Sequence, residues 1–130
     1  QEVRQDMLRE VLQGKIHNAT VTEANLNYVG SITIDTKLIE GAGFWIGQKV
    51  LVVSNTTGAR LETYVIAAPA GSGTIGINGA AAHLIKAGEE VIVIGFCLSG
   101  KPVEPKVILV DQKNRFVREL VERPSTPLPP

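Results

Sequence analysis

The chain has 130 residues, the length of one ordinary domain. Its 13 basic and 13 acidic side chains cancel, and only 5% of its residues are aromatic, so nothing favours a nucleic-acid partner or an anionic membrane surface. A single cysteine, Cys97, excludes an intrachain disulfide and fits a cytoplasmic location. No stretch is long and apolar enough to suggest a membrane span.

Residues 1–6 are polar, unlike a signal peptide, and we expect them to be an N-terminal extension of the domain. After them, β-branched apolar residues that alternate or run together predict a succession of strands. The predicted strands cover residues 16–22, 31–34, 48–54, 60–67, 74–78, 90–97 and 106–110. Residues 23–25 are turn-prone, and residues 55–58 and 69–73 each predict a hairpin turn.

Helix signals are few and short. Thr36 is the predicted N-cap of a helix over residues 37–41, and residues 79–85 suit a brief helix closed by Gly88. Many short strands with glycine-rich turns between them favour a mainly β fold, a small closed or nearly closed barrel with a few short helices. We expect one domain over residues 7–120 and a disordered, proline-rich tail over residues 121–130.

The segment Gly71-Ser72-Gly73-Thr74-Ile75-Gly76 matches the dinucleotide-binding pattern G-x-G-x-x-G. That motif needs a strand before it and a helix after it, so that the phosphate meets a helix N-terminus. Here the pattern begins in a predicted turn and continues into the strand predicted over residues 74–78. A nucleotide-binding oxidoreductase is therefore the weaker interpretation of these glycines.

Metal binding and hydrolase chemistry find little support. The two histidines, His17 and His83, and Cys97 show no zinc-type spacing, and Cys97 lies in an apolar run typical of a core thiol. Ser31, His17 and Asp35 could form a hydrolase triad, but no nucleophile elbow surrounds the serine. We predict no metal site.

Gly30-Ser31 is the most informative step in the chain. A serine hydroxyl can attack the carbonyl of the preceding residue, and a glycine there removes the Cβ that would obstruct the geometry. Completed, this attack cuts the chain and converts Ser31 into a pyruvoyl group, an electrophile that no ordinary side chain provides. The dipeptide is common and also occurs at Gly71-Ser72, so the surrounding residues must decide.

Three residues of ordinary type, Arg60, Tyr64 and Lys15, could serve such an electrophile. Arg60 and Tyr64 are four residues apart on one predicted strand and should share a face, whereas Thr63 should lie on the opposite face. Arg60 suits a bidentate grip on a carboxylate, and Lys15 offers a second positive charge.

Blocks along most of the chain carry a resemblance to a known family. They are Met7-Leu8-Arg9, Gly14-Lys15-Ile16-His17, residues 19–28, Val29-Gly30-Ser31-Ile32-Thr33-Ile34-Asp35, residues 55–64 and Ile77-Asn78-Gly79-Ala80-Ala81-Ala82. From Met7 to about Leu120 the chain resembles the pyruvoyl-dependent aspartate 1-decarboxylases. It departs from their pattern at Asn18, where arginine is usual.

The resemblance implies a double-psi β-barrel that assembles as a homotetramer with active sites at subunit interfaces. It also implies roles for individual residues. Gly30 provides the cleaved carbonyl, Ser31 becomes the pyruvoyl group that forms a Schiff base with substrate, Thr63 and Tyr64 assist cleavage, and Tyr64 is our candidate proton donor. Substrate contacts are expected from Arg60, Lys15, Asn78, Gly79, Ala80 and Ala81, with His17 and Tyr28 as weaker candidates.

The implied reaction converts L-aspartate to β-alanine and CO2 for pantothenate and coenzyme A synthesis. The pyruvoyl group would be its only cofactor, with neither metal nor pyridoxal phosphate, and a maturation factor is a possible partner. The competing interpretation is a binding or scaffold protein that keeps the double-psi barrel and never cleaves itself.

Overall fold

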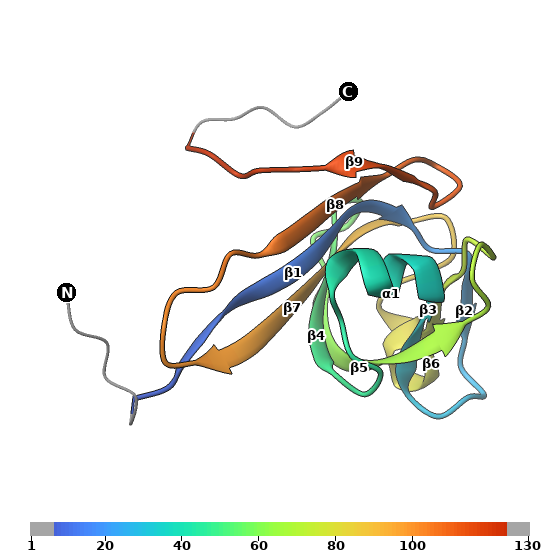
Figure 1. The fold of residues 1–130 in the computed structure, drawn as a ribbon. Coiled ribbons are helices and arrows are strands. Elements are labelled where there is room, and N and C mark those ends of the chain that lie inside the picture. The colour runs from blue at the N-terminus through green and yellow to red at the C-terminus, as the bar shows by residue number, and fades with distance from the viewer. Residues whose placement is uncertain (1–6, 125–130) are drawn as a thin grey trace.

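The computed structural model describes residues 7–124, which form one mixed β-sheet with a helix and a 3-10 turn. Figure 1 shows the strands curling around a common interior, with α1 lying across them. The elements are β1 (Arg9–Thr20), β2 (Glu23–Asn25), β3 (Ser31–Asp35), α1 (Thr36–Ala42), β4 (Lys49–Ser54), β5 (Arg60–Ala68), β6 (Ile75–Asn78), η1 (Gly79–His83), β7 (Glu90–Ser99), β8 (Lys106–Val110) and β9 (Phe116–Glu119).

Strand pairing is mixed. The order across the nine-stranded sheet is β2-β6-β3-β5-β4-β7-β1-β8-β9, and β1/β8, β2/β6 and β3/β5 are parallel pairs among antiparallel ones. Strands that pair in parallel cannot be joined by a tight hairpin turn, so the chain between them forms a longer crossover connection. The prediction of a mainly β fold, a small barrel with a few short helices, is confirmed.

The core is aliphatic and β3 runs through its middle. Ile32 and Ile34 on β3, and Ile75 and Ile77 on β6, are fully buried. Burying a side chain of this size stabilises the fold by about 1.5–3 kcal/mol relative to exposure. Side chains alternate between the two faces of a strand. Because Ile32 and Ile34 share one face of β3, Ser31, Thr33 and Asp35 lie on the other face.

Asp35, rather than the predicted Thr36, caps α1. Its carboxylate accepts hydrogen bonds from the backbone N–H of Lys37, Gly71 and Gly73, each at 2.9 Å. Burial by itself would raise the pKa of Asp35, but these donors outweigh it and hold the pKa below its usual value. One buried carboxylate therefore fixes both the start of the helix and the glycine loop.

The same contacts explain what the glycines of the G-x-G-x-x-G segment do in this fold. Gly71 and Gly73 have positive φ, and their N–H groups bind Asp35 in the way that such backbone turns bind an anion. Gly76 lies in β6, not at the start of a helix. The donors that a phosphate would need are occupied by an internal carboxylate.

Other predictions need correction. Residues 23–25 are not a turn but form β2, which pairs with β6. Residues 69–73 are not a hairpin turn, because β5 and β6 lie on opposite sides of β3. β1 begins at Arg9, well before the predicted residue 16, and the exposed strand β9 was not predicted.

Several predictions hold. The hairpin turn over residues 55–58 joins the antiparallel strands β4 and β5. A helix follows β3, and the brief helix after β6 is a 3-10 turn that ends at His83. Its C-cap is Leu84 and not the predicted Gly88, whose N–H donates to the carbonyl oxygen of Val21 instead. The predicted extension over residues 1–6 and the part of the predicted tail over residues 125–130 lie outside the described residues. The domain over residues 7–120 and a tail that begins at residue 121 stay predictions.

Replacing Asp35 with asparagine should cost about 1–3 kcal/mol of unfolding free energy at pH 7, because buried N–H groups lose a charged acceptor. Since the folded pKa is lowered, this stability is present above the unfolded carboxyl pKa of about 4 and is lost as the pH falls through the folded pKa. Urea unfolding should therefore show the gap between Asp35→Asn and the parent narrowing in acid. Glu40→Gln, at an exposed site on α1, is the control, and a gap independent of pH would contradict the assignment.

Candidate active site around Ser31

Ser31 is the first residue of β3 and is held between two strands. It pairs with Asn78 of antiparallel β6, and one residue later Ile32 pairs with Val65 of parallel β5. Ser31 is only 3% exposed, whereas Gly30 before it lies in an exposed bend. The Gly30-Ser31 peptide bond thus joins a surface loop to the buried end of a central strand.

Asn78 positions the serine hydroxyl. The amide Nδ2 of this buried residue donates to Ser31 Oγ at 2.9 Å and to Thr33 Oγ1 at 2.8 Å. Both N–H groups of the amide are used, and Ser31 Oγ is the acceptor, so its own proton remains available to another group. Thr33 was not predicted as a site residue, although its alternation with Ser31 on one strand face was a usable signal.

Gly79 is the glycine that this corner requires. Its φ is +72°, and a Cβ built on it would lie 2.8 Å from both the Cα and the N of Gly30 and 2.9 Å from the carbonyl oxygen of Tyr28. At Gly30 a Cβ would meet only the carbonyl oxygen of Asn78, at 3.9 Å. Outside its own chain neighbours, a Cβ would therefore be obstructed at Gly79 and not at Gly30.

β5 brings two predicted residues to the edge of the site. Continuing the β3/β5 register by one residue places Tyr64 beside Ser31, and Thr63 precedes it. Arg60 and Tyr64 are exposed on one face, and Thr63 is half-buried on the other, as predicted. Four residues of strand separate Arg60 from Tyr64, about 13 Å along β5.

Lys15 and His17 lie elsewhere in the chain. They belong to β1, which is four places from β3 in the sheet order and pairs with β7 and β8 rather than with β3, β5 or β6. Lys15 Nζ forms an ion pair with Glu122. His17 is buried, its Nε2 has no hydrogen-bond partner among residues 7–124, and burial, reinforced by Lys15, lowers its pKa.

The remaining candidates lie next to Asn78 in sequence or against Gly79. Gly79, Ala80 and Ala81 begin η1, directly after Asn78, and of these Ala80 is exposed. Tyr28 has its carbonyl against Gly79 while its side chain is 61% exposed. Strand pairing within the chain thus brings Ser31, Asn78, Gly79 and Tyr64 together, and it does not join Lys15 and His17 to them.

A hydrolase triad is not assembled. Ser31 and Asp35 stand at opposite ends of β3, and the carboxylate of Asp35 is engaged by three backbone donors. Among residues 7–124, no three His, Cys, Asp or Glu side chains gather as ligands for a metal ion. In the same part of the chain, no helix is long and apolar enough to cross a bilayer.

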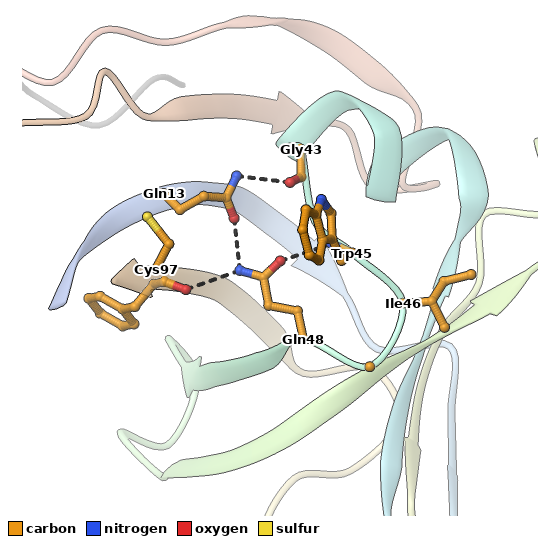
Figure 2. A pocket seen from close by; sticks show the side chains of 8 residues that line it. Gln13, Gly43, Trp45, Ile46, Gln48 and Cys97 are labelled. Atoms are coloured by element: carbon orange, nitrogen blue, oxygen red, sulfur yellow. Dashed lines mark hydrogen bonds between the residues drawn. The ribbon is translucent and has the colours of Figure 1, made fainter. Parts of the chain in front are cut away.

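A cavity of about 440 Å³ opens away from these residues. Figure 2 shows two amide side chains in its lining: Gln13 donates to the carbonyl oxygen of Gly43, and Gln48 donates to Gln13 Oε1 and to the carbonyl oxygen of Phe96. Gln13 also donates to the carbonyl oxygen of Ala42. The lining residues are Gln13, Gly43, Trp45, Ile46, Gly47, Gln48, Phe96 and Cys97. The amides of Gln13 and Gln48 form hydrogen bonds with each other and with backbone carbonyls. No predicted site residue lines the cavity.

Comparison with known proteins decides the family. Residues 7–117 match the model of the aspartate decarboxylase family. The chain belongs to this family. It is 54% identical over 116 residues to an aspartate 1-decarboxylase of Caldicellulosiruptor saccharolyticus, covering 86% of this chain and 91% of that protein. An aspartate 1-decarboxylase of Bacillus velezensis is 47% identical over 123 residues, covering 92% of this chain and 97% of the relative.

Gly79→Ala should destabilise the fold more than Gly88→Ala. Both residues have positive φ and would pay about 1–2 kcal/mol for a side chain in that conformation. Only at Gly79 would the new methyl also meet backbone, since nothing lies within 4 Å of a Cβ at Gly88. Urea unfolding should show the larger loss at Gly79, and equal losses would contradict the close approach of Gly30.

Proposed function

We propose that this chain is a self-processing aspartate 1-decarboxylase whose electrophile derives from Ser31. The observation that carries the proposal is the hydrogen bond of 2.9 Å from buried Asn78 Nδ2 to Ser31 Oγ, at the end of a peptide bond that Gly79 approaches closely. Membership of the aspartate decarboxylase family and the name shared by its relatives support the same activity.

Self-cleavage would occur at the Gly30-Ser31 peptide bond and would need no other reactant than water. Ser31 Oγ attacks the carbonyl carbon of Gly30, the C–N bond breaks, and the residue 30 acyl group moves from nitrogen to oxygen as an ester. Loss of the Cα proton of residue 31 then expels the Gly30 carboxylate and leaves dehydroalanine. Water adds to its imine form and ammonia departs, which gives a pyruvoyl group at the new terminus.

The residues around Ser31 fit this chemistry. Asn78 donates a hydrogen bond to Ser31 Oγ and so restrains the hydroxyl that would attack the Gly30 carbonyl. Positioning of this kind lowers the barrier of an intramolecular reaction. Thr63 and Tyr64 adjoin the step on β5 and are proposed to donate to the oxygen that becomes negative, where one donor contributes about 3–4 kcal/mol.

The group proposed at residue 31 is small and planar, and it follows the loop that Gly79 approaches closely. A pyruvoyl carbonyl there supplies an electron sink for the charge left when a carboxylate departs from the substrate. Asn78, with the backbone of Gly79, Ala80 and Ala81, is proposed to hold the group or the departing carboxylate. Tyr64 is the proposed proton donor, because its side chain is partly exposed beside Ser31.

L-Aspartate carries two carboxylates, so its site needs two cations. We assign these roles to Arg60, exposed on the same face of β5 as Tyr64, and to Lys15. His17 and Tyr28 are weaker candidates for the surroundings of the substrate. Lys15 is on β1, which does not pair with β3, β5 or β6, and we propose that a second copy of the chain supplies it to the site.

Apolar exposure near Ser31 supports such an assembly. Leu26 is 51% exposed, Tyr28 61% and Val29 83%, and all three lie in the loop that leads into the cleavage site. Contiguous apolar groups at a surface mark contact sites between proteins. We propose a homotetramer with active sites at its interfaces, and light scattering of the native protein tests its molar mass.

The product would be β-alanine, used in pantothenate and coenzyme A synthesis. The pyruvoyl group is the proposed cofactor. The cytoplasmic location predicted from the single cysteine stays a prediction.

Intact mass under denaturing conditions tests the proposal. Purified protein should separate into fragments divided after Gly30, the second lacking a free amino terminus, and should release β-alanine from L-aspartate. Ser31→Ala should leave one uncleaved chain without activity, while Ser72→Ala, at the other Gly-Ser step, should cleave normally. If purified protein cleaves only after a cell extract is added, a maturation factor is required.

An uncleaved parent chain that forms no β-alanine, even after incubation with extract, would contradict the proposal. That result would favour the competing interpretation, a barrel that binds a partner without processing itself.

A further inference from the structure

The end of the described chain lies across the lysine that we assign to substrate binding. We call residues 116–124 the C-terminal strap. β9, at the start of the strap, pairs with β8, and the N–H of Leu120 donates to the carbonyl oxygen of Val107 at 2.8 Å. Val107 in turn pairs with Lys15 on β1, and Figure 1 shows β9, β8 and β1 side by side. Two residues after Leu120, the carboxylate of Glu122 reaches Lys15 Nζ.

Exposure and charge make this ion pair exchangeable. The Lys15 side chain is 18% exposed and that of Glu122 is 57% exposed, so the carboxylate covers the ammonium from the solvent side. All four residues of β9 are exposed, so the strap can release Glu122 without opening the core. Burial and Lys15 lower the pKa of neighbouring His17 more than Glu90 and Glu122 raise it.

We propose that Glu122 is an internal competitor of the substrate for Lys15, and that it sets the affinity of the enzyme for dicarboxylates. The role of Lys15 rests on the proposed function. Glu122 presents a carboxylate on a methylene stem, which is the same group that L-aspartate presents. An incoming substrate carboxylate would replace that of Glu122 on Lys15 Nζ, and the strap would move outward into solvent.

The contribution should be moderate. Ion pairs with one well-exposed partner are weak, so Glu122 should weaken binding of substrate about two- to fivefold rather than block the site. The competitor would keep Lys15 neutralised between turnovers.

Steady-state kinetics of Glu122→Gln and Glu122→Ala test the proposal, with Glu119→Gln on the same strap as the matched control. Both Glu122 variants should lower the KM for L-aspartate about two- to fivefold, with kcat retained. Glu119→Gln should leave both constants unchanged. Calorimetric titration with succinate, which has both carboxylates but no amine, should show tighter binding by the same factor.

Unchanged KM and unchanged succinate affinity in both Glu122 variants, with normal cleavage after Gly30, would overturn this inference and leave the proposed function standing. The absence of succinate binding in every form would overturn it too. A parent chain that neither cleaves nor forms β-alanine contradicts the proposed function, and in that case the succinate titration alone decides whether Glu122 competes for Lys15.

Discussion

The backbone of Gly79 lies against the backbone of Gly30, and the rest of the candidate site depends on that approach. With φ at +72° and less than 3 Å between its absent Cβ and Gly30, residue 79 has room for a hydrogen only. The contact brings the start of η1 against the loop that ends at Ser31. It also places Asn78, one residue earlier, directly opposite Ser31 in the β3/β6 pair.

A buried polar group inside an aliphatic barrel needs a hydrogen-bond partner, and Asn78 is the partner of two hydroxyl groups, those of Ser31 and Thr33. Leaving a buried hydroxyl or amide unpaired costs about 1–3 kcal/mol, so the Ser31, Thr33 and Asn78 side chains hold one another in place. The two segments around Gly30 are also anchored separately. β1 and β2 before it pair with β7, β8 and β6, and β3 after it pairs with β5 and β6, so cleavage there would leave both fragments in one fold.

Sequence reasoning reached the fold class because alternation and β-branching are local signals. It failed where a remote partner decides the structure. Asp35 caps α1 because N–H groups from residues 71 and 73 also converge on it, and β2 is a strand because β6 lies beside it. β9 escaped prediction because all four of its residues are exposed and give no pattern of burial.

The same limit applies to the site. Family resemblance named Ser31, Asn78 and Tyr64, and the strand register brings them together. The position of Lys15 in the sheet and its pairing with Glu122 depend on sheet order and on the C-terminal strap, which no local pattern encodes. Thr33 was missed although it shares a strand face with Ser31, since a threonine in a strand is ordinarily read as packing.

The central claim is that residue 31 becomes the electrophile. Reductive trapping tests it most directly: purified protein is incubated with L-aspartate and cyanoborohydride, digested, and searched by mass spectrometry for the modified peptide. The account predicts that the substrate-derived mass is found on the terminal residue of the fragment that begins at position 31, and that Ser31→Ala protein carries none. Label on a lysine, or no label in a protein that decarboxylates aspartate, would contradict it.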